Sequence, residues 1–130
     1  MILTEALICL AATIYFEARG EPLDGQVAVA KVVMNRVESP NYPNTVCGVV
    51  TQKRKSVCAF SFNCDKINLS VQDSRAWTNA VRIASLVYRG KLKDPTKGAT
   101  HYHATYVYPQ WAEGAVAVAI GNHLFYRGLK

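Results

Sequence analysis

At 130 residues the chain has the length of a single domain, and it can bury roughly two thirds of the surface that it exposes when unfolded. Hydrophobic residues make up 50% of the chain, which excludes an intrinsically disordered protein. The 15 Lys and Arg residues outnumber the 9 Asp and Glu residues, and the net charge of +6 favours polyanionic partners. Nucleic acid is not expected among them, because the only tight basic cluster, Lys53 to Lys55, lacks any nucleic-acid-binding motif.

An apolar helix is the first element that the sequence predicts. Thr4 is a suitable N-cap, and Gly20 stops the helix. Apolar residues recur between these limits at helical spacing, at Leu7, Leu10, Ala11, Ile14 and Ala18. Because Ile8 and Cys9 are apolar as well, we expect this helix to be central and buried on most sides.

The same apolar run has the length of a signal-peptide core, but its flanks differ from those of a signal peptide. Glu5 stands where a signal peptide carries positive charge, and the run continues into Glu17 without a small-residue cleavage site. The run is also too short to span a bilayer. We therefore expect a mature domain with no export signal of its own and no stable membrane insertion.

Two further helices and several strand-forming stretches follow. The predictions in chain order are a helix over 24–37, a loop at Pro40 and Pro43, a strand or hairpin over 47–64, a helix over 73–89, extended or irregular structure over 100–109, and a strand or a helix over 115–126. The inward stripe of the helix over 24–37 is expected to be Val27, Ala30, Val33, Met34 and Val37. The sum is one α+β domain over residues 1–130, predominantly helical, with a small β-sheet or hairpin inserted after the second helix.

The four cysteines contain no CxxC pair, so they do not predict a zinc site. Cys9 lies inside the apolar helix and is interpreted as a plain core residue. Cys47, Cys58 and Cys64 fall within one short segment. An oxidising compartment would favour one disulfide among these three, with the pairing left open.

Glu17 is the candidate catalytic residue because of where it stands. It lies in the last turn of the apolar helix, where the negative end of the helix dipole disfavours a further negative charge, and Tyr15 and Phe16 solvate a charge poorly. Both effects favour the protonated carboxyl, which can donate a proton to a leaving-group oxygen. A surface glutamate that pairs with Arg19 is the alternative, and the helix alone does not exclude it.

The remaining carboxylates give weaker grounds for a catalytic role. Glu21 is interpreted as a structural carboxylate that bonds backbone NH groups or Arg19, at the edge of the substrate site. Asp24, Asp65 and Glu113 stand in no comparable context, and a two-carboxylate mechanism needs a partner at a defined separation. A single acid suffices if the sugar's own hydroxyl is the nucleophile, and the product is then an anhydro-sugar.

The segment "HYH", residues 101–103, concentrates functional groups. On a strand His101 and His103 face the same side, which would suit a metal ion with His123 or Glu17 as a third ligand. We favour a polar groove or hydrogen bonds within the domain, because no HExxH helix accompanies these residues, and we expect no metal or other cofactor. Aromatic residues that can stack on sugar faces surround this segment, namely Tyr102, Tyr106, Tyr108, Trp111 and Tyr126.

Five stretches of the chain resemble one known family, in that family's order. They are "IYFEARGEPLDGQVAVAKVVMNRV" (14–37), "YPNTVCGVVTQ" (42–52), "CAFSFNCD" (58–65), "GATHYHATYVYPQWA" (98–112) and "IGNHLFYR" (120–127). They are similar to the bacterial and phage cell wall hydrolases of the spore-cortex-lytic type. The resemblance covers most of the chain.

This resemblance implies a lysozyme-like fold, related to goose-type lysozymes and lytic transglycosylases. It also implies cleavage of peptidoglycan between N-acetylmuramic acid and N-acetylglucosamine, with the first glutamate of "EARGE", Glu17 here, as the catalytic acid. The "ATHYH" and "FYR" versions resemble the phage and Gram-negative branch of the family. We therefore interpret the chain as an endolysin-like enzyme of a bacteriophage that reaches the periplasmic wall through a holin or in a phage particle.

The expected reaction is that of a monomeric lytic transglycosylase acting on glycan strands. The residues expected to hold the glycan are Glu21, Ser61, Phe62, His101, Tyr102, His103 and Tyr126. Three alternatives stay open: a muramidase that uses water, a metal-dependent N-acetylmuramoyl-L-alanine amidase or peptidase that uses His101, His103 and His123, and a noncatalytic wall-binding module. No wall-binding repeat is seen, so we expect substrate affinity to come from the groove and the net charge.

Overall fold

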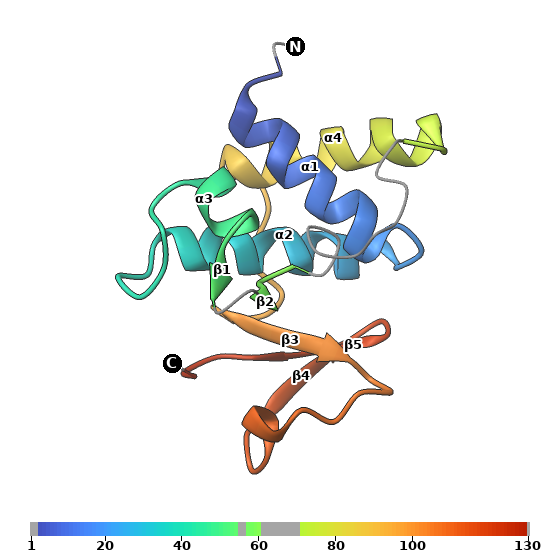
Figure 1. Cartoon of the computed structure of the whole chain (residues 1–130). Coiled ribbons are helices and arrows are strands. Elements are labelled where there is room, and N and C mark those ends of the chain that lie inside the picture. The colour runs from blue at the N-terminus through green and yellow to red at the C-terminus, as the bar shows by residue number, and fades with distance from the viewer. Residues whose placement is uncertain (1–2, 55–56, 61–70, 130) are drawn as a thin grey trace.

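The structure, a computed structural model, describes residues 3–54, 57–60 and 71–129. Its elements in chain order are α1 (Glu5–Ala18), α2 (Leu23–Val37), α3 (Val46–Val50), β1 (Lys53–Arg54), β2 (Val57–Cys58), α4 (Ser74–Tyr88), β3 (His101–Ala104), η2 (Gln110–Ala112), β4 (Ala117–Ile120) and β5 (His123–Tyr126). The helices gather on one side of the molecule, and β3, β4 and β5 lie on the other (Figure 1). No helix in the described ranges is both long and apolar enough to cross a membrane.

Helix α1 is the centre of the helical layer. Thr4 caps it as predicted, because its hydroxyl accepts a hydrogen bond from the backbone NH of Leu7 at 3.3 Å. The helix packs against α2, α3 and α4. As expected, it is buried on most sides, and only Glu5 and Ile8 near its start are exposed.

Helix α2 packs against both layers. Val27 and Val33 of its predicted stripe are buried in the cluster that α2 shares with α1 and α4. Val29 and Val32, on another side of the helix, are buried against Phe125 of the sheet. The prediction of a single inward stripe was incomplete, since a helix covered on two sides needs apolar residues on both.

Helix α4 begins and ends close to the predicted positions. Asp73 caps it by accepting the backbone NH of Ala76 at 3.0 Å, and Gly90 follows its end with a φ of +71°. Tyr15 of α1 anchors the start of α4, because its hydroxyl accepts the backbone NH groups of Gln72 and Asp73, both at 3.0 Å. The residue two positions before Glu17 therefore ties α1 to α4.

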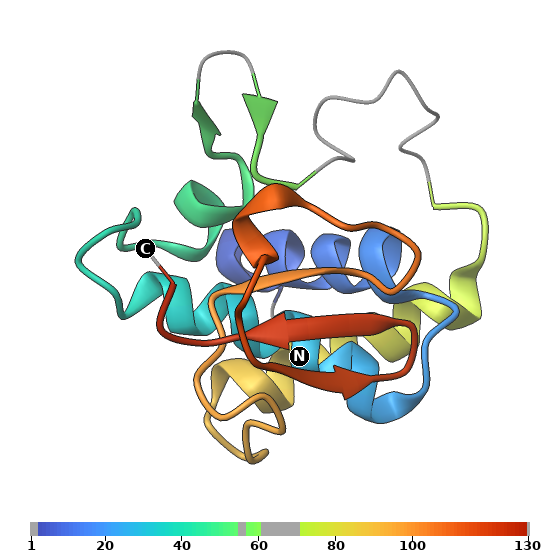
Figure 2. The same cartoon turned by 90° about the horizontal axis from the view of Figure 1, so that it is seen from below.

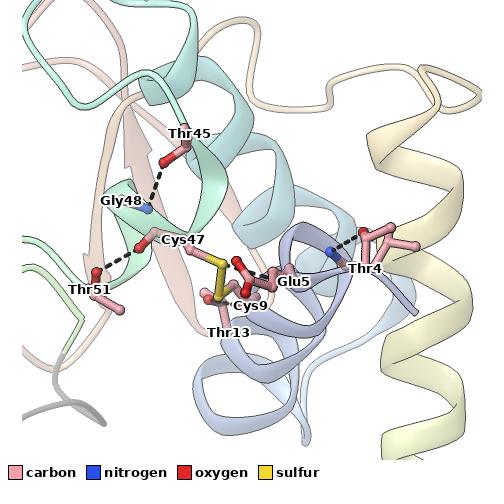
Figure 3. The surroundings of a disulfide bond; sticks show 9 residues. Thr4, Glu5, Cys9, Thr13, Thr45, Cys47, Gly48 and Thr51 are labelled. Atoms are coloured by element: carbon pink, nitrogen blue, oxygen red, sulfur yellow. Dashed lines mark hydrogen bonds between the residues drawn. A yellow bond between two sulfur atoms is a disulfide. The ribbon is translucent and has the colours of Figure 1, made fainter. Parts of the chain in front are cut away.

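A disulfide bond between Cys9 and Cys47 joins α1 to α3, as Figure 3 shows, with the two Cα atoms 5.4 Å apart. The interpretation of Cys9 as a plain core residue was wrong, and Cys47 pairs with Cys9 rather than within its own segment. Cys58 is also disulfide-bonded, and Cys64 lies outside the described residues. The pairing follows from the packing of α1 on α3, which brings together positions 38 residues apart.

The main sheet is antiparallel, in the order β3-β5-β4, and it lies at the C-terminal end of the chain. The predicted small sheet after the second helix is a separate, second sheet. A two-stranded hairpin of β1 and β2 does stand there, while residues 61–64 of the predicted alternation lie outside the described ranges. The segment 115–126, predicted as a strand or a helix, forms β4 and β5, because Gly121 makes the turn between them with a φ of +58°.

Candidate active site

Glu17 lies in the last turn of α1 and meets the sheet at Tyr102. The hydroxyl of Tyr102 in β3 donates a hydrogen bond to Oε1 of Glu17 at 2.7 Å. Burial raises the pKa of Tyr102 well above its usual value, and the Glu17 carboxylate raises it further. The phenol therefore stays protonated near neutral pH, and it holds one oxygen of the carboxyl group in a defined place.

The inner face of the sheet fixes the ring of Tyr102. Successive side chains of β3 point to opposite faces, and Tyr102 points toward the helices. Phe125 stacks on its ring at 5.5 Å between centroids, and the ring of His123 meets it edge-on at 5.1 Å. Because Phe125 is itself buried against α2, the position of the Tyr102 hydroxyl follows from the packing of the two layers.

Glu21 binds the turn between β4 and β5. Its Oε1 accepts the backbone NH of Asn122 at 2.7 Å, and its Oε2 accepts the side-chain amide of Asn122 at 3.1 Å. A side chain at position 121 would overlap this carboxylate, which explains the need for Gly121. Glu21 thus bonds a backbone NH group as predicted, and its partner is Asn122 rather than Arg19.

His123 lies beside the Glu21 carboxylate. Its Nδ1 is 3.5 Å from Oε1 of Glu21, and it is buried without a hydrogen-bond partner among the described residues. Burial lowers the pKa of His123, although the charges of Glu21 and Glu17 act in the opposite direction. The imidazole is therefore neutral near pH 7, so the hydrogen bonds from Asn122, and not a charged histidine, stabilise the Glu21 carboxylate.

The outer face of the sheet carries a second cluster of rings. Trp111 of η2 lies at centroid distances of 5.3, 5.6 and 5.4 Å from three rings, those of His101, His103 and Tyr126. Nδ1 of His103 is 2.7 Å from the next backbone carbonyl, so in the neutral ring this nitrogen carries the proton. Its Nε2 then accepts the hydroxyl hydrogen of Tyr126 at 2.6 Å, which locks the two outer rings together.

A loop that the sequence analysis did not single out leads into β3. Asp94 accepts hydrogen bonds from the backbone NH groups of Thr96 at 2.8 Å and Gly98 at 3.0 Å, and from the Asn35 amide at 2.9 Å. Burial raises the pKa of Asp94, but the hydrogen bonds from Thr96, Asn35 and Gly98 outweigh it and hold the pKa below its usual value. The run "DPTKG", residues 94–98, is a turn signal that could have indicated this loop.

Helix α2 holds the start of β3 through two adjacent side chains. The amide of Asn35 donates to the carbonyl of Ala99 at 2.9 Å, and Nε of Arg36 donates to the carbonyl of Thr100 at 2.7 Å. Each bond spans 64 residues, so no local pattern could have shown it. Asn35 and Arg36 thereby hold the two residues that precede β3, which begins at His101, one residue before Tyr102.

The structure separates the predicted glycan contacts into two groups. The first group is on the inner side, where Tyr102 contacts Glu17 and Glu21 binds the β4–β5 turn. Ser61 and Phe62 lie outside the described residues. His101, His103 and Tyr126 gather on the outer face.

The metal alternative required the histidines of "HYH" to meet a third ligand. His101 and His103 share a face as predicted for a strand, but His123 packs against Tyr102 on the other face. Within residues 3–54, 57–60 and 71–129, no three His, Cys, Asp or Glu side chains come together as a metal site.

A family model described as Cell Wall Hydrolase matches residues 20–126. Among curated relatives, the spore cortex-lytic enzyme of Halalkalibacterium halodurans is 37% identical over 95 residues, which are 72% of this chain and 25% of that enzyme. The spore cortex-lytic enzyme of Bacillus subtilis is 58% identical over 41 residues, 32% of this chain and 13% of that enzyme. The chain therefore spans a quarter or less of the length of these two enzymes.

Two solved structures share the fold over nearly the whole chain. The catalytic domain of the germination-specific lytic transglycosylase SleB from Bacillus anthracis is 34% identical, with a TM-score of 0.73 over 96% of this chain and 97% of that domain. The catalytic domain of the Bacillus cereus SleB protein is 29% identical, with a TM-score of 0.61 over 97% of this chain and 93% of that domain. The helices and the three-stranded sheet are thus those of these catalytic domains.

Proposed function

Since this chain belongs to the cell wall hydrolase family, we propose that it is a lytic transglycosylase that cleaves peptidoglycan between N-acetylmuramic acid and N-acetylglucosamine. The observation that carries this proposal is the 2.7 Å hydrogen bond from Tyr102 to Glu17. It gives the carboxyl group at the end of an apolar helix a fixed orientation, which general acid catalysis requires. The printed name of the Bacillus anthracis neighbour, a lytic transglycosylase, supports this class of reaction.

In the proposed mechanism Glu17 acts twice. It first protonates the glycosidic oxygen while the bond to muramic acid breaks. The resulting carboxylate then takes the proton from the 6-hydroxyl of the same sugar, whose oxygen closes on C1 to form the anhydro ring. The second proton replaces the first, so the cycle consumes no water and needs no second catalytic carboxylate.

The surrounding residues would orient the acid and the glycan. Tyr102, which remains protonated, holds Glu17 through both steps. Glu21 already uses both oxygens on Asn122, and we assign it the task of holding the β4–β5 turn at the edge of the site. The further glycan contacts in the proposal are Ser61 and Phe62, together with His101, His103 and Tyr126, which lie on the outer face of the sheet and away from Glu17. The complete site is proposed as a lysozyme-like one within a single domain that acts as a monomer.

The compartment in which the enzyme acts is the second part of the proposal. A net charge of +6 favours an approach to the anionic cell wall, and the Cys9–Cys47 disulfide suits an oxidising environment outside the cytoplasm. The "ATHYH" and "FYR" motifs favour the phage and Gram-negative branch of the family, with delivery to the periplasmic wall by a holin or in a phage particle.

Digestion of purified peptidoglycan with analysis of the fragments by mass spectrometry tests the reaction. We expect the wild type to release fragments with anhydromuramic ends. We expect Glu17→Gln to release none and to keep the wild-type unfolding curve, because the amide preserves the shape and lacks the proton. Glu5→Gln is the matched control, since Glu5 is an exposed glutamate in the first turn of the same helix.

Each other product would replace the proposal with a specific alternative. Reducing muramic ends would identify a muramidase that uses water. Free stem peptides, lost on treatment with a chelator, would identify a metal-dependent amidase or peptidase. Intact sacculi with bound protein would identify a wall-binding module, and full activity of Glu17→Gln would remove Glu17 from the mechanism.

A further inference from the structure

The segment between β3 and β4, residues 105–116, exposes a cluster of large apolar side chains. They and their exposed fractions are Tyr106 81%, Val107 42%, Tyr108 88%, Trp111 45% and Val116 90%. Glu113 is the only charged residue of this segment, in a chain whose net charge is +6. Exposed apolar clusters of this kind mark binding surfaces, and the lack of positive charge indicates a ligand that is not a polyanion.

A cavity of about 360 Å³ opens between this segment and the sheet, and Tyr108 is the member of the cluster that lines it. Its floor is the outer face of the sheet, with His103, Leu124 and Tyr126. Its wall includes Tyr108, Gln110 and Glu113 from the segment after β3. This volume is sufficient for one sugar ring with its N-acetyl group.

The chemistry of the wall suits a neutral, hydroxyl-rich ring. Tyr108 offers a flat apolar face that is almost fully exposed, on which the C–H face of a pyranose can stack. Gln110 and Glu113 are exposed, and their side chains form no hydrogen bond or ion pair with the described part of the chain. The amide and the carboxylate are therefore available to sugar hydroxyls and to the N-acetyl NH group.

The cavity is held in shape before any ligand binds. Trp111 sits among the three rings of the outer face, and it anchors the segment on the sheet. Two turn hydrogen bonds, from Ala112 to the Pro109 carbonyl at 3.1 Å and from Glu113 to the Gln110 carbonyl at 3.2 Å, close η2. A preorganised wall reduces the entropy that binding would cost.

The cavity is distinct from the position of Glu17. Glu17 meets Tyr102 on the inner side of the sheet, whereas the cavity is built on the outer face, and neither of these two residues lines it. η2 lies on the side of the sheet away from the helices in Figure 1. Figure 2, which looks onto the sheet with the helices behind it, shows the segment that leaves β3 turning back alongside that strand.

We propose that this cavity is an accessory glycan-binding site, which takes an N-acetylhexosamine ring of a peptidoglycan strand away from the bond that Glu17 attacks. The identity of the ligand rests on the proposed function, because a wall-degrading enzyme meets glycan strands on every side. The site supplies affinity for the wall within the catalytic chain itself. Tyr108 is its stacking platform, and Gln110 and Glu113 are its hydrogen-bonding groups.

Binding measured in the inactive Glu17→Gln protein tests the site separately from catalysis. The probes are the N-acetylglucosamine tetramer, followed by NMR and calorimetry, and purified sacculi, followed by sedimentation. We expect Tyr108→Ala to weaken binding about fivefold to tenfold, as for other well-placed aromatic contacts, and Tyr108→Phe to retain it. We expect the tetramer to shift the amide resonances of residues 108–113.

Tyr106→Ala is the matched control, because Tyr106 is a similarly exposed tyrosine of the same segment that does not line the cavity. Wild-type binding by Tyr108→Ala would overturn the proposal. An equal loss in Tyr106→Ala, or resonance shifts confined to the surroundings of Tyr102, would overturn it too. The outcomes with the N-acetylglucosamine tetramer, which lacks the bond to muramic acid, do not depend on whether Glu17 is the catalytic acid, which the fragment analysis decides.

Discussion

The Tyr102 hydroxyl donates a hydrogen bond to Oε1 of Glu17 at 2.7 Å, although 85 positions separate the two residues in the sequence. The bond joins the last turn of α1 to the first strand of the C-terminal sheet. Since Phe125 holds the Tyr102 ring and is itself buried against α2, the orientation of Glu17 depends on how the helical layer and the sheet pack. A change in that packing would therefore alter the orientation of Glu17 without any substitution at Glu17 itself.

Tyr102→Phe removes this hydrogen bond and keeps the stacked ring. We expect turnover on purified peptidoglycan to fall about tenfold to a hundredfold, because a hydrogen bond to a charged group contributes about 1.5–3 kcal/mol. Tyr106→Phe is the control, and unchanged turnover in Tyr102→Phe would show that the hydroxyl does not orient the acid.

Gly121→Ala tests the contact between Glu21 and the β4–β5 turn. Gly121 and Gly114 both adopt positive φ, +58° and +76°, but only the side chain added at 121 would overlap the Glu21 carboxylate. We expect Gly114→Ala to lower the free energy of unfolding by about 1 kcal/mol and Gly121→Ala by about 2–4 kcal/mol. Urea unfolding measures both values, and equal losses would mean that the Glu21 contact contributes nothing.

The Cys9–Cys47 disulfide should make the domain depend on an oxidising environment. A bridge between positions 38 residues apart restricts the unfolded chain, and its loss should lower the free energy of unfolding by about 2–4 kcal/mol. We expect the double variant Cys9→Ser, Cys47→Ser to show this loss without any reductant. Because Cys58 is also disulfide-bonded, dithiothreitol should destabilise the wild type by more than the double variant, and equal effects of the reductant would contradict the assignment.

Asp94→Asn tests the loop that leads into β3. The pKa of Asp94 is lowered in the folded protein, so its stabilisation is fully present above the unfolded pKa of about 3.9 and is lost as the pH falls through the folded pKa. We expect the variant to lose about 1–2 kcal/mol at pH 7, a range that allows for partial exposure. The difference in free energy of unfolding between the wild type and Asp94→Asn should be smaller at pH 3 than at pH 7. The same difference at both pH values would show that the carboxylate is not its source.

Much of the helical layer could be predicted, because its signals are local. Thr4 and Asp73 cap α1 and α4 through bonds to backbone groups three residues away, and Gly90 adopts the positive φ that ends α4. Such contacts need only a few neighbouring residues, and a short window of sequence contains all of them. The placing of Glu17 in the last turn of α1 followed from the same signals.

The sheet could be predicted only in part. Residues 117–126 have the composition of strands, but their Val and Ala content also fits a helix, and only pairing with β3 decides the question. That pairing forms a face against α2, which explains why the second buried side of α2 was also missed. A strand depends on its partners, and these are distant in the sequence.

Local chemistry was sufficient to place α1, α2 and α4 and to single out Glu17 as a carboxyl group in an apolar setting. It did not place α3, which lies in the stretch predicted as a strand or hairpin and forms where Thr45 caps it and it packs against α1 and α2. The tertiary structure decided the partners, which are Tyr102 for Glu17, Asn122 for Glu21 and Cys47 for Cys9. It also divided the rings of "THYHATYVYP" between the face that meets Glu17 and the face that forms the accessory cavity. Backbone preferences depend on neighbours within a few residues, whereas these contacts span 38 to 101 residues and form only when the helical layer and the sheet pack together.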